Sequence, residues 1–130
     1  MTFKKLTPNL MVEDVEQTLT FYTDVLDFDV LATVPEQGPY DWAMLGKDDV
    51  TLMFQARSSL GEEIPALADA PLGGSLTFYT DISGVMAWYE RLKDKVEIVQ
   101  DVHTTFYNTR EFAFRDCNGY IVALSEPLQA

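Results

Sequence analysis

Apolar residues recur along this chain with two different spacings. Between residues 13 and 26, and again between Ile82 and Lys93, they return every three or four positions, which predicts a helix in each segment. Shorter apolar runs bounded by turn residues predict strands at Leu6–Val12, Phe28–Val34, Tyr40–Leu45, Val50–Gln55, Ser75–Thr80 and Val96–Val99, and a hairpin across Thr109–Pro127. The order β-α-β-β-β therefore occurs twice.

The two halves also match residue by residue. A shift of 67 positions places Asp14 on Asp81, and a shift of 70 places Val50–Phe54 on Tyr120–Leu124. The same shift of 70 places Trp42, Ala43 and Met44 on Phe112, Ala113 and Phe114. These matches indicate a duplicated βαβββ module.

The predicted fold class is α+β, with two tandem βαβββ modules forming curved mixed sheets around a central cleft. The single domain divides into a first module at 1–57, a linker at 58–74 and a second module at 75–130. The linker is rich in proline and glycine and is expected to hold at most a short helical turn at Pro65–Asp69.

Side chains alternate between the two faces of a strand, which sorts the strand residues into two rows. Leu10, Val12 and Phe78 are expected to face the helices, and Trp42 and Phe54 have the same parity, although both are also near enough to the cleft to stack on a ligand. The row facing the cleft is expected to contain Thr7, Asn9, Met11, Asp41, Thr51, Met53, Gln55, Ser75, Thr77, Tyr79, Glu111, Ala113, Ile121, Ala123 and Ser125.

Composition narrows the functional classes. Nine basic against 21 acidic residues give a net charge of −12, which disfavours nucleic acid and anionic membranes as partners and favours cationic ligands. No apolar run is long enough to span a membrane, so we expect a cytoplasmic protein. Cys117 is the only cysteine and excludes an internal disulfide.

Three stretches carry a resemblance to a known family: "LMVEDVEQTLTFYTDVLDF", "VTLMFQARSSL" and "REFAFRDCNGYIVALSEP". Together they resemble the glyoxalase / bleomycin resistance / extradiol dioxygenase superfamily, which has the vicinal oxygen chelate fold, over nearly the whole chain. The fold hosts several functions, so the resemblance does not select one.

The resemblance implies where a metal would sit. Metal enzymes of this superfamily place ligands on the first and last strand of each module, and those positions hold Thr7, Ser75, Met53 and Ala123 here. None of these residue types is a usual ligand for a divalent metal. His103, the only histidine, is expected in a loop, where it is solvated or contacts a ligand. We therefore expect no metal and no cofactor.

Three hypotheses remain open. The first is a metal-free binding protein that sequesters a cationic or aromatic small molecule, as antibiotic-resistance proteins of the superfamily do, and that forms a homodimer. The second is an enzyme of lyase, isomerase or dioxygenase type with unusual or absent metal ligands, and the third is a protein-binding domain with a vestigial cleft. The candidate ligand-binding residues are Glu111, Tyr79, Tyr107, Phe106, Asp41, Asn9 and Gln55. Glu111 has an alternative partner in Arg115, which is four residues further along the strand and two positions away on the same face, and Arg57 is a candidate for an anionic ligand.

Overall fold

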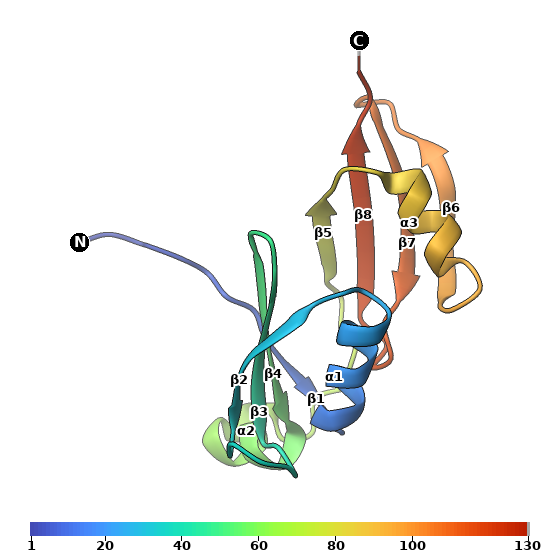
Figure 1. Cartoon of the computed structure of the whole chain (residues 1–130). Coiled ribbons are helices and arrows are strands. Elements are labelled where there is room, and N and C mark those ends of the chain that lie inside the picture. Colours follow the sequence, from blue (N-terminus) through green and yellow to red (C-terminus); the bar gives the residue numbers. More distant parts are fainter. Residues whose placement is uncertain (130) are drawn as a thin grey trace. The chain divides into compact units, whose positions relative to one another are not determined.

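The computed structural model describes residues 1–129 and divides the chain into two compact units, Met1–Pro71 and a second that begins at Leu72 (Figure 1). The first unit contains β1 (Asn9–Val12), α1 (Val15–Asp24), β2 (Asp29–Val34), β3 (Trp42–Lys47), β4 (Val50–Ala56), α2 (Arg57–Glu63) and the 3-10 turn η1 (Pro65–Leu67). The second contains β5 (Thr77–Asp81), α3 (Val85–Leu92), β6 (Glu97–Thr104), β7 (Thr109–Arg115) and β8 (Ile121–Pro127).

The two units have the same sheet topology. The strand order is β1-β4-β3-β2 in the first sheet and β5-β8-β7-β6 in the second. In each sheet the first strand runs parallel to the last, and the other neighbours are antiparallel. The mixed sheets and the repeated order confirm the predicted α+β class built from tandem βαβββ modules.

Helix α1 begins at Val15 because Asp14 caps it. The Asp14 carboxylate accepts a hydrogen bond from the Gln17 backbone N–H at 3.0 Å, which satisfies one of the donors that a helix N-terminus leaves free. The helix then lays Tyr22 on the sheet, with its ring centroid 4.9 Å from that of Phe54. Phe54 is completely buried, which confirms its expected core position.

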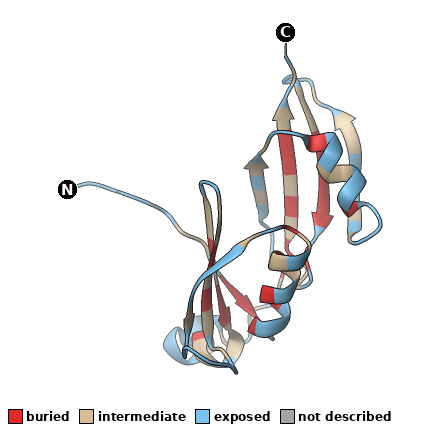
Figure 2. Ribbon diagram, viewed as in Figure 1, coloured by how far each residue is buried: buried red, intermediate tan, exposed pale blue. Residues whose placement is uncertain are grey.

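Helix α3 packs in the same way on the second sheet. Tyr89 meets the ring of Phe112 edge-on at 5.2 Å, and Phe112 and Phe114 are both completely buried. Figure 2 shows that the buried positions of the second sheet concentrate in its two central strands, β7 and β8. We call the face of each sheet opposite α1 or α3 its inner face.

The strand pairing corrects one part of the predicted repeat. Ala43 and Leu45 are completely buried beneath α1, as Phe112 and Phe114 are beneath α3, so β3 maps onto β7 with a shift of 69 rather than 70. A shift of one position exchanges the two faces of a strand. Trp42 is therefore on the inner face, where it pairs with Gln55, and its expected core position is wrong.

Two further segments differ from the sequence-based prediction. Helix α2 occupies Arg57–Glu63, where a linker is expected, while η1 confirms the short helical turn after Pro65. Strand β6 continues to Thr104, beyond the predicted end at Val99, with irregular register between Ile98 and His103. A strand interrupted by bulges does not keep strict alternation of apolar and polar residues, which is why its second half resembles a loop in the sequence.

Candidate functional site

A buried carboxylate surrounded by hydroxyl groups lies on the inner face of the second sheet. Glu111 of β7 is only 6% exposed and accepts hydrogen bonds from four side chains. Its Oε2 accepts from the Tyr79 hydroxyl, from Thr109 Oγ1 at 2.8 Å and from Ser125 Oγ at 2.9 Å. The Tyr107 hydroxyl donates to both carboxylate oxygens, at 3.0 and 3.1 Å. We call these four residues and Glu111 the hydroxyl cage.

Strand pairing brings the hydroxyl cage together. Ser125 lies directly opposite Glu111 across β7 and β8, and Thr109 precedes Glu111 by two positions on the same face. Tyr79 comes from β5, where it pairs with Ala123. Because the residue opposite Tyr79 is only alanine, the Tyr79 ring has room to lie across β8 and reach the carboxylate on the strand beyond.

The hydroxyl cage favours the ionised form of Glu111. Burial raises the pKa of the Glu111 carboxyl, but hydrogen bonds from Tyr79, Thr109, Ser125 and Tyr107 outweigh burial and hold this pKa below its usual value. Partial burial and the hydrogen bond to Glu111 raise the pKa of the Tyr107 hydroxyl to about 12. Near neutral pH the cage thus contains one negative charge, on Glu111, and a protonated Tyr107 hydroxyl.

Three aromatic side chains at this site reach the surface. Tyr79 is 52% exposed and Tyr107 is 49% exposed, so each ring shows a face to solvent while its hydroxyl points at Glu111. Phe106 is almost fully exposed and meets the Tyr107 ring edge-on at 5.0 Å. Exposed aromatic rings beside a buried charge suit the stacking of a planar or cationic ligand.

His103 belongs to the same face. The sequence places it in a loop, but it lies in β6 and pairs directly with Glu111, so the two side chains project from the same side of the sheet. Its Nδ1 is 2.9 Å from the carbonyl oxygen of Asp101. A carbonyl oxygen can only accept, so Nδ1 carries a proton directed at it, and when the ring holds only that proton Nε2 is an acceptor.

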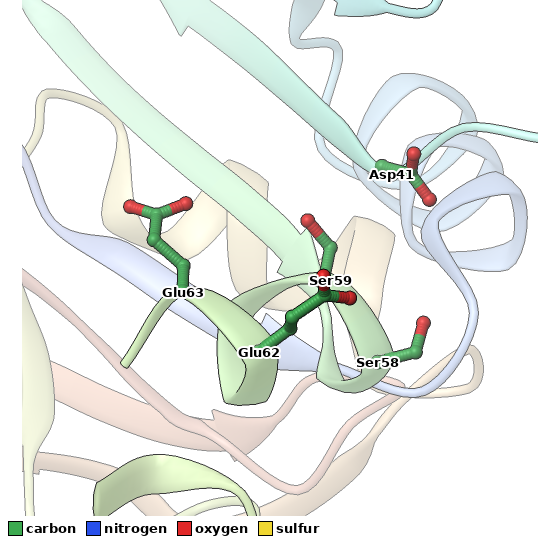
Figure 3. A pocket seen from close by; sticks show the side chains of 5 residues that line it. All are labelled: Asp41, Ser58, Ser59, Glu62 and Glu63. Atoms are coloured by element: carbon green, nitrogen blue, oxygen red, sulfur yellow. The ribbon is translucent and has the colours of Figure 1, made fainter. Parts of the chain in front are cut away.

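Asn9 and Gln55 form a separate polar cluster in the first unit. The Asn9 amide donates to Gln55 Oε1 at 2.8 Å, and Gln55 Nε2 donates to Ser59 Oγ at 2.9 Å and to Glu63 at 3.0 Å. Gln55 is thereby joined to α2 and is buried. Beside this cluster lies an open pocket of about 440 Å³. Its lining residues are Asp41, Ser58, Ser59, Glu62 and Glu63 (Figure 3).

Asp41 does not occupy the position expected for it. Its backbone pairs with Ala56 rather than with Gln55, so it has the parity of the outer row, and Trp42 is the counterpart of Glu111 in the repeat. Asp41 lies just before β3 and, in Figure 3, belongs to the pocket wall formed mainly by α2. The expected symmetry between the two carboxylates is therefore wrong.

The two arginines with open roles bind their own chain. Arg57 pairs with Glu13, and its Nη1 donates to the carbonyl oxygens of Ala68 and Ala70 at 3.0 and 2.8 Å. Arg115 donates to Glu97 at 2.7 Å and not to Glu111. The first arginine holds the segment after α2 against the first unit, and the second leaves Glu111 to the hydroxyls.

The structure thus gathers the predicted site residues in two groups. Glu111, Tyr79 and Tyr107 share the hydroxyl cage with Phe106 at its edge, whereas the other three lie in the first unit. Sequence reasoning placed Ser125 on this face but did not include it or Thr109 among the ligand-binding residues. Ser125 lies two positions after Ala123, and Thr109 lies two positions before Glu111. Because side chains alternate between the faces of a strand, this spacing indicates that both residues lie on the same face as the predicted site.

The described residues also bear on metal binding and on membrane insertion. Within residues 1–129, no group of three or more His, Cys, Asp or Glu side chains is arranged so that it could hold a metal ion. Met53 pairs with Asn9 and Ala123 pairs with Tyr79, so the last-strand positions that the family resemblance marks for ligands present a thioether and a methyl group. No helix in this part of the chain is long and apolar enough to cross a membrane.

Comparison with known proteins identifies a family that matches most of the chain. A family model described as the glyoxalase/bleomycin resistance protein/dioxygenase superfamily matches residues 5–124. No curated protein gives a significant match. A solved glyoxalase/bleomycin resistance protein/dioxygenase from Nocardioides is 22% identical with a TM-score of 0.79, covering 100% of this chain and 87% of that one.

Two further solved structures have the same fold. A protein of unknown function from Agrobacterium tumefaciens str. C58 is 18% identical with a TM-score of 0.79, covering 98% of this chain and 97% of that one. A lactoylglutathione lyase from Agrobacterium tumefaciens is also 18% identical, with a TM-score of 0.68 and coverage of 96% and 94%. At these identities the structures show the fold and do not transfer an activity.

Proposed function

Because this chain belongs to the glyoxalase/bleomycin resistance protein/dioxygenase superfamily, we propose that it is a metal-free member that binds a small cationic or aromatic molecule on the inner face of its second sheet. The observation that carries the proposal is the hydroxyl cage with its half-exposed tyrosines. A carboxylate buried at 6% exposure is costly unless its hydrogen bonds are complete, and here they are complete without any ligand. The rings of Tyr79, Tyr107 and Phe106 are left as the contact surface.

The charge of the protein supports a cationic ligand. The net charge of −12 attracts cations, and an aromatic face binds them by cation–π attraction, most strongly where the ring is partly desolvated. The ionised Glu111 beneath the rings adds to this attraction. Glu111 itself is too buried and too fully hydrogen-bonded to form a direct ion pair, so its effect acts through the tyrosines.

The metal-free part of the proposal rests on residue chemistry. Thr7, Ser75, Met53 and Ala123 stand where the family resemblance places metal ligands, and His103 lies beside only one carboxylate, which is already occupied by hydroxyls. Such a set does not offer the three or four converging imidazole or carboxylate donors of a tight divalent site. Homodimerisation belongs to the same proposal, and light scattering of the purified protein tests it.

Two measurements on the purified protein test the binding function. Metal analysis is expected to find far less than one divalent ion per chain, and one tightly bound ion per chain would contradict the metal-free proposal. A thermal-shift screen with planar cationic compounds, including bleomycin-type drugs, is expected to yield at least one compound that raises the midpoint with its concentration, because a ligand of the folded state stabilises by mass action.

An enzyme on the same fold is the second candidate, and the position of His103 favours it. An imidazole beside an ionised carboxylate on the proposed ligand-binding face has the composition of a general acid–base pair. The two functions differ in the fate of the ligand. Under the binding function, mass spectrometry recovers the ligand unchanged after prolonged incubation, whereas a product that His103→Asn no longer forms would establish the enzyme.

A further inference from the structure

The hydroxyl cage fixes the direction of its own protons. A hydroxyl group has one proton to donate, and an ionised carboxylate can only accept. The protons of Thr109, Ser125 and Tyr107 are therefore directed at Glu111. Tyr79 has Glu111 and, at 3.1 Å, Ser125 Oγ as acceptors, and with either of them its proton points into the cage.

A second layer reinforces this direction. The Thr109 backbone N–H donates to Thr105 Oγ1 at 3.1 Å, so that oxygen is used as an acceptor. Thr105 Oγ1 lies 2.7 Å from Thr109 Oγ1, whose own proton goes to Glu111, so the Thr105 proton is the one between them. With the Thr109 proton on Glu111, the proton order runs from Thr105 through Thr109 to Glu111, and the other acceptor within reach of Thr105 Oγ1, the Thr109 carbonyl oxygen, is farther away at 3.5 Å.

The outward side of the site is consequently poor in donors. Tyr79 and Tyr107 are about half exposed as whole residues, and with the protons directed inward a hydroxyl oxygen that a ligand reaches can only accept a hydrogen bond. The neighbouring His103 offers Nε2, which is also an acceptor when the ring carries only the Nδ1 proton directed at the Asp101 carbonyl. Tyr79 of β5, His103 of β6 and Tyr107 of the loop between β6 and β7 therefore all present hydrogen-bond acceptors.

We propose that Glu111 is a positioning residue that turns the Tyr79 and Tyr107 hydroxyls into fixed hydrogen-bond acceptors, so that this face selects ligands that donate hydrogen bonds. The ligand class is then an amine, an amidine or an aromatic ring with an N–H group, and a ring of the same shape without a donor binds less well. This inference rests on the proposed function, since it specifies the ligand of the same face.

Neutral probes separate this polarity from the general attraction of an acidic protein for cations. Indole and benzofuran have almost the same shape and no charge, but only indole donates a hydrogen bond. Their dissociation constants are measured by NMR titration of the full chain. We expect indole to bind about threefold to tenfold more tightly, as one net hydrogen bond would produce.

Substitution of Glu111 tests the positioning role. In Glu111→Gln the side-chain oxygen can replace Oε2 and still accept from Tyr79 and Tyr107, but an NH₂ group then replaces Oε1 and donates to the Tyr107 oxygen, which uses a lone pair that a ligand would need. The preference for indole is expected to fall. Glu90→Gln removes the same charge from the exposed surface of α3 and is expected to keep the preference.

The outcomes distinguish the inference from the function beneath it. Equal binding of the two probes by the native protein, or an unchanged preference in Glu111→Gln, overturns the inference and leaves the binding function standing. Absence of binding by both probes and by benzamidine, a charged donor, overturns both. If Glu111→Gln does not fold, Tyr107→Phe removes one acceptor from a half-exposed ring, and an unchanged preference in that variant overturns the inference.

Discussion

Replacing Glu111 by glutamine should destabilise the fold by an amount that the hydroxyl cage allows us to calculate. The amide oxygen can keep the three hydrogen bonds that Oε2 accepts from Tyr79, Thr109 and Ser125, but as neutral bonds. A hydrogen bond to a charged group is worth roughly 1 kcal/mol more than a neutral one, which gives about 3 kcal/mol for three. Removing a buried charge returns part of this through its desolvation cost, so we expect a net loss of about 1–2 kcal/mol.

The dependence of this loss on pH identifies its origin. The folded-state pKa of Glu111 is lower than the usual value of 4.5, so its ionisation stabilises the fold fully above the unfolded-state pKa and progressively less as the pH falls through the folded-state pKa. The difference in unfolding free energy between native protein and Glu111→Gln should be constant from about pH 6 to 8 and narrow below about pH 4.5.

Urea unfolding at a series of pH values measures both quantities. Glu90→Gln is the matched control, because its carboxylate lies on the surface of α3 in an exposed pair with Lys93, and we expect a change within about 0.5 kcal/mol. A Glu111→Gln variant as stable as the native protein at pH 7, or a loss that does not narrow in acid, would refute the assignment of an ionised carboxylate to the cage.

Three other predictions test separate parts of the structure. Phe114→Ala should cost about 3–5 kcal/mol in urea unfolding because the ring is completely buried, whereas Phe106→Ala, at an almost fully exposed ring, should cost less than about 0.5 kcal/mol; similar losses would contradict the assigned core. Arg57→Lys should speed hydrogen exchange at Ala68 and Ala70 several-fold, because lysine lacks the guanidinium fork that holds this segment, and Arg115→Lys should leave those amides unchanged. Treatment with EDTA and then with excess Mn²⁺ or Zn²⁺ should leave the thermal midpoint unchanged, and a loss restored by metal would disprove the metal-free proposal.

The order of elements other than α2 was predictable because each of these strands and helices has its own pattern. Helices α1 and α3 have apolar residues at helical spacing, and Asp14, expected as a helix-start residue, is the N-cap of α1. The repeat then supplied the pairing of the strands. The spacing of the hairpins was predicted less accurately. An error of one residue in the repeat exchanges the two faces of a strand, and this error assigned Trp42 and Asp41 to the wrong rows.

Part of the candidate site was also predictable, because parity alone brings Tyr79, Glu111 and Ser125 to one face. Sequence reasoning assigned Glu111 to direct contact with a cationic ligand. We propose that the tyrosine rings make this contact instead, because Glu111 is 6% exposed and already accepts hydrogen bonds from four hydroxyls. The number of hydrogen bonds that converge on one carboxylate depends on side-chain directions across three strands, and strand parity does not contain that information. The position of His103 in β6 was not predicted because the register of this strand is irregular.

The most direct test of the central claim is an NMR titration of the isotope-labelled full chain with 9-aminoacridine, a planar aromatic cation. We expect saturable shifts of the backbone amides of Tyr79, Tyr107, Glu111 and Ala123, with those of α3 unchanged, because the ligand should cover the inner face of the second sheet and leave the helix on the opposite face. The absence of saturable shifts, or shifts centred on α3 or on the acidic pocket beside α2, would contradict the assignment of ligand binding to this face.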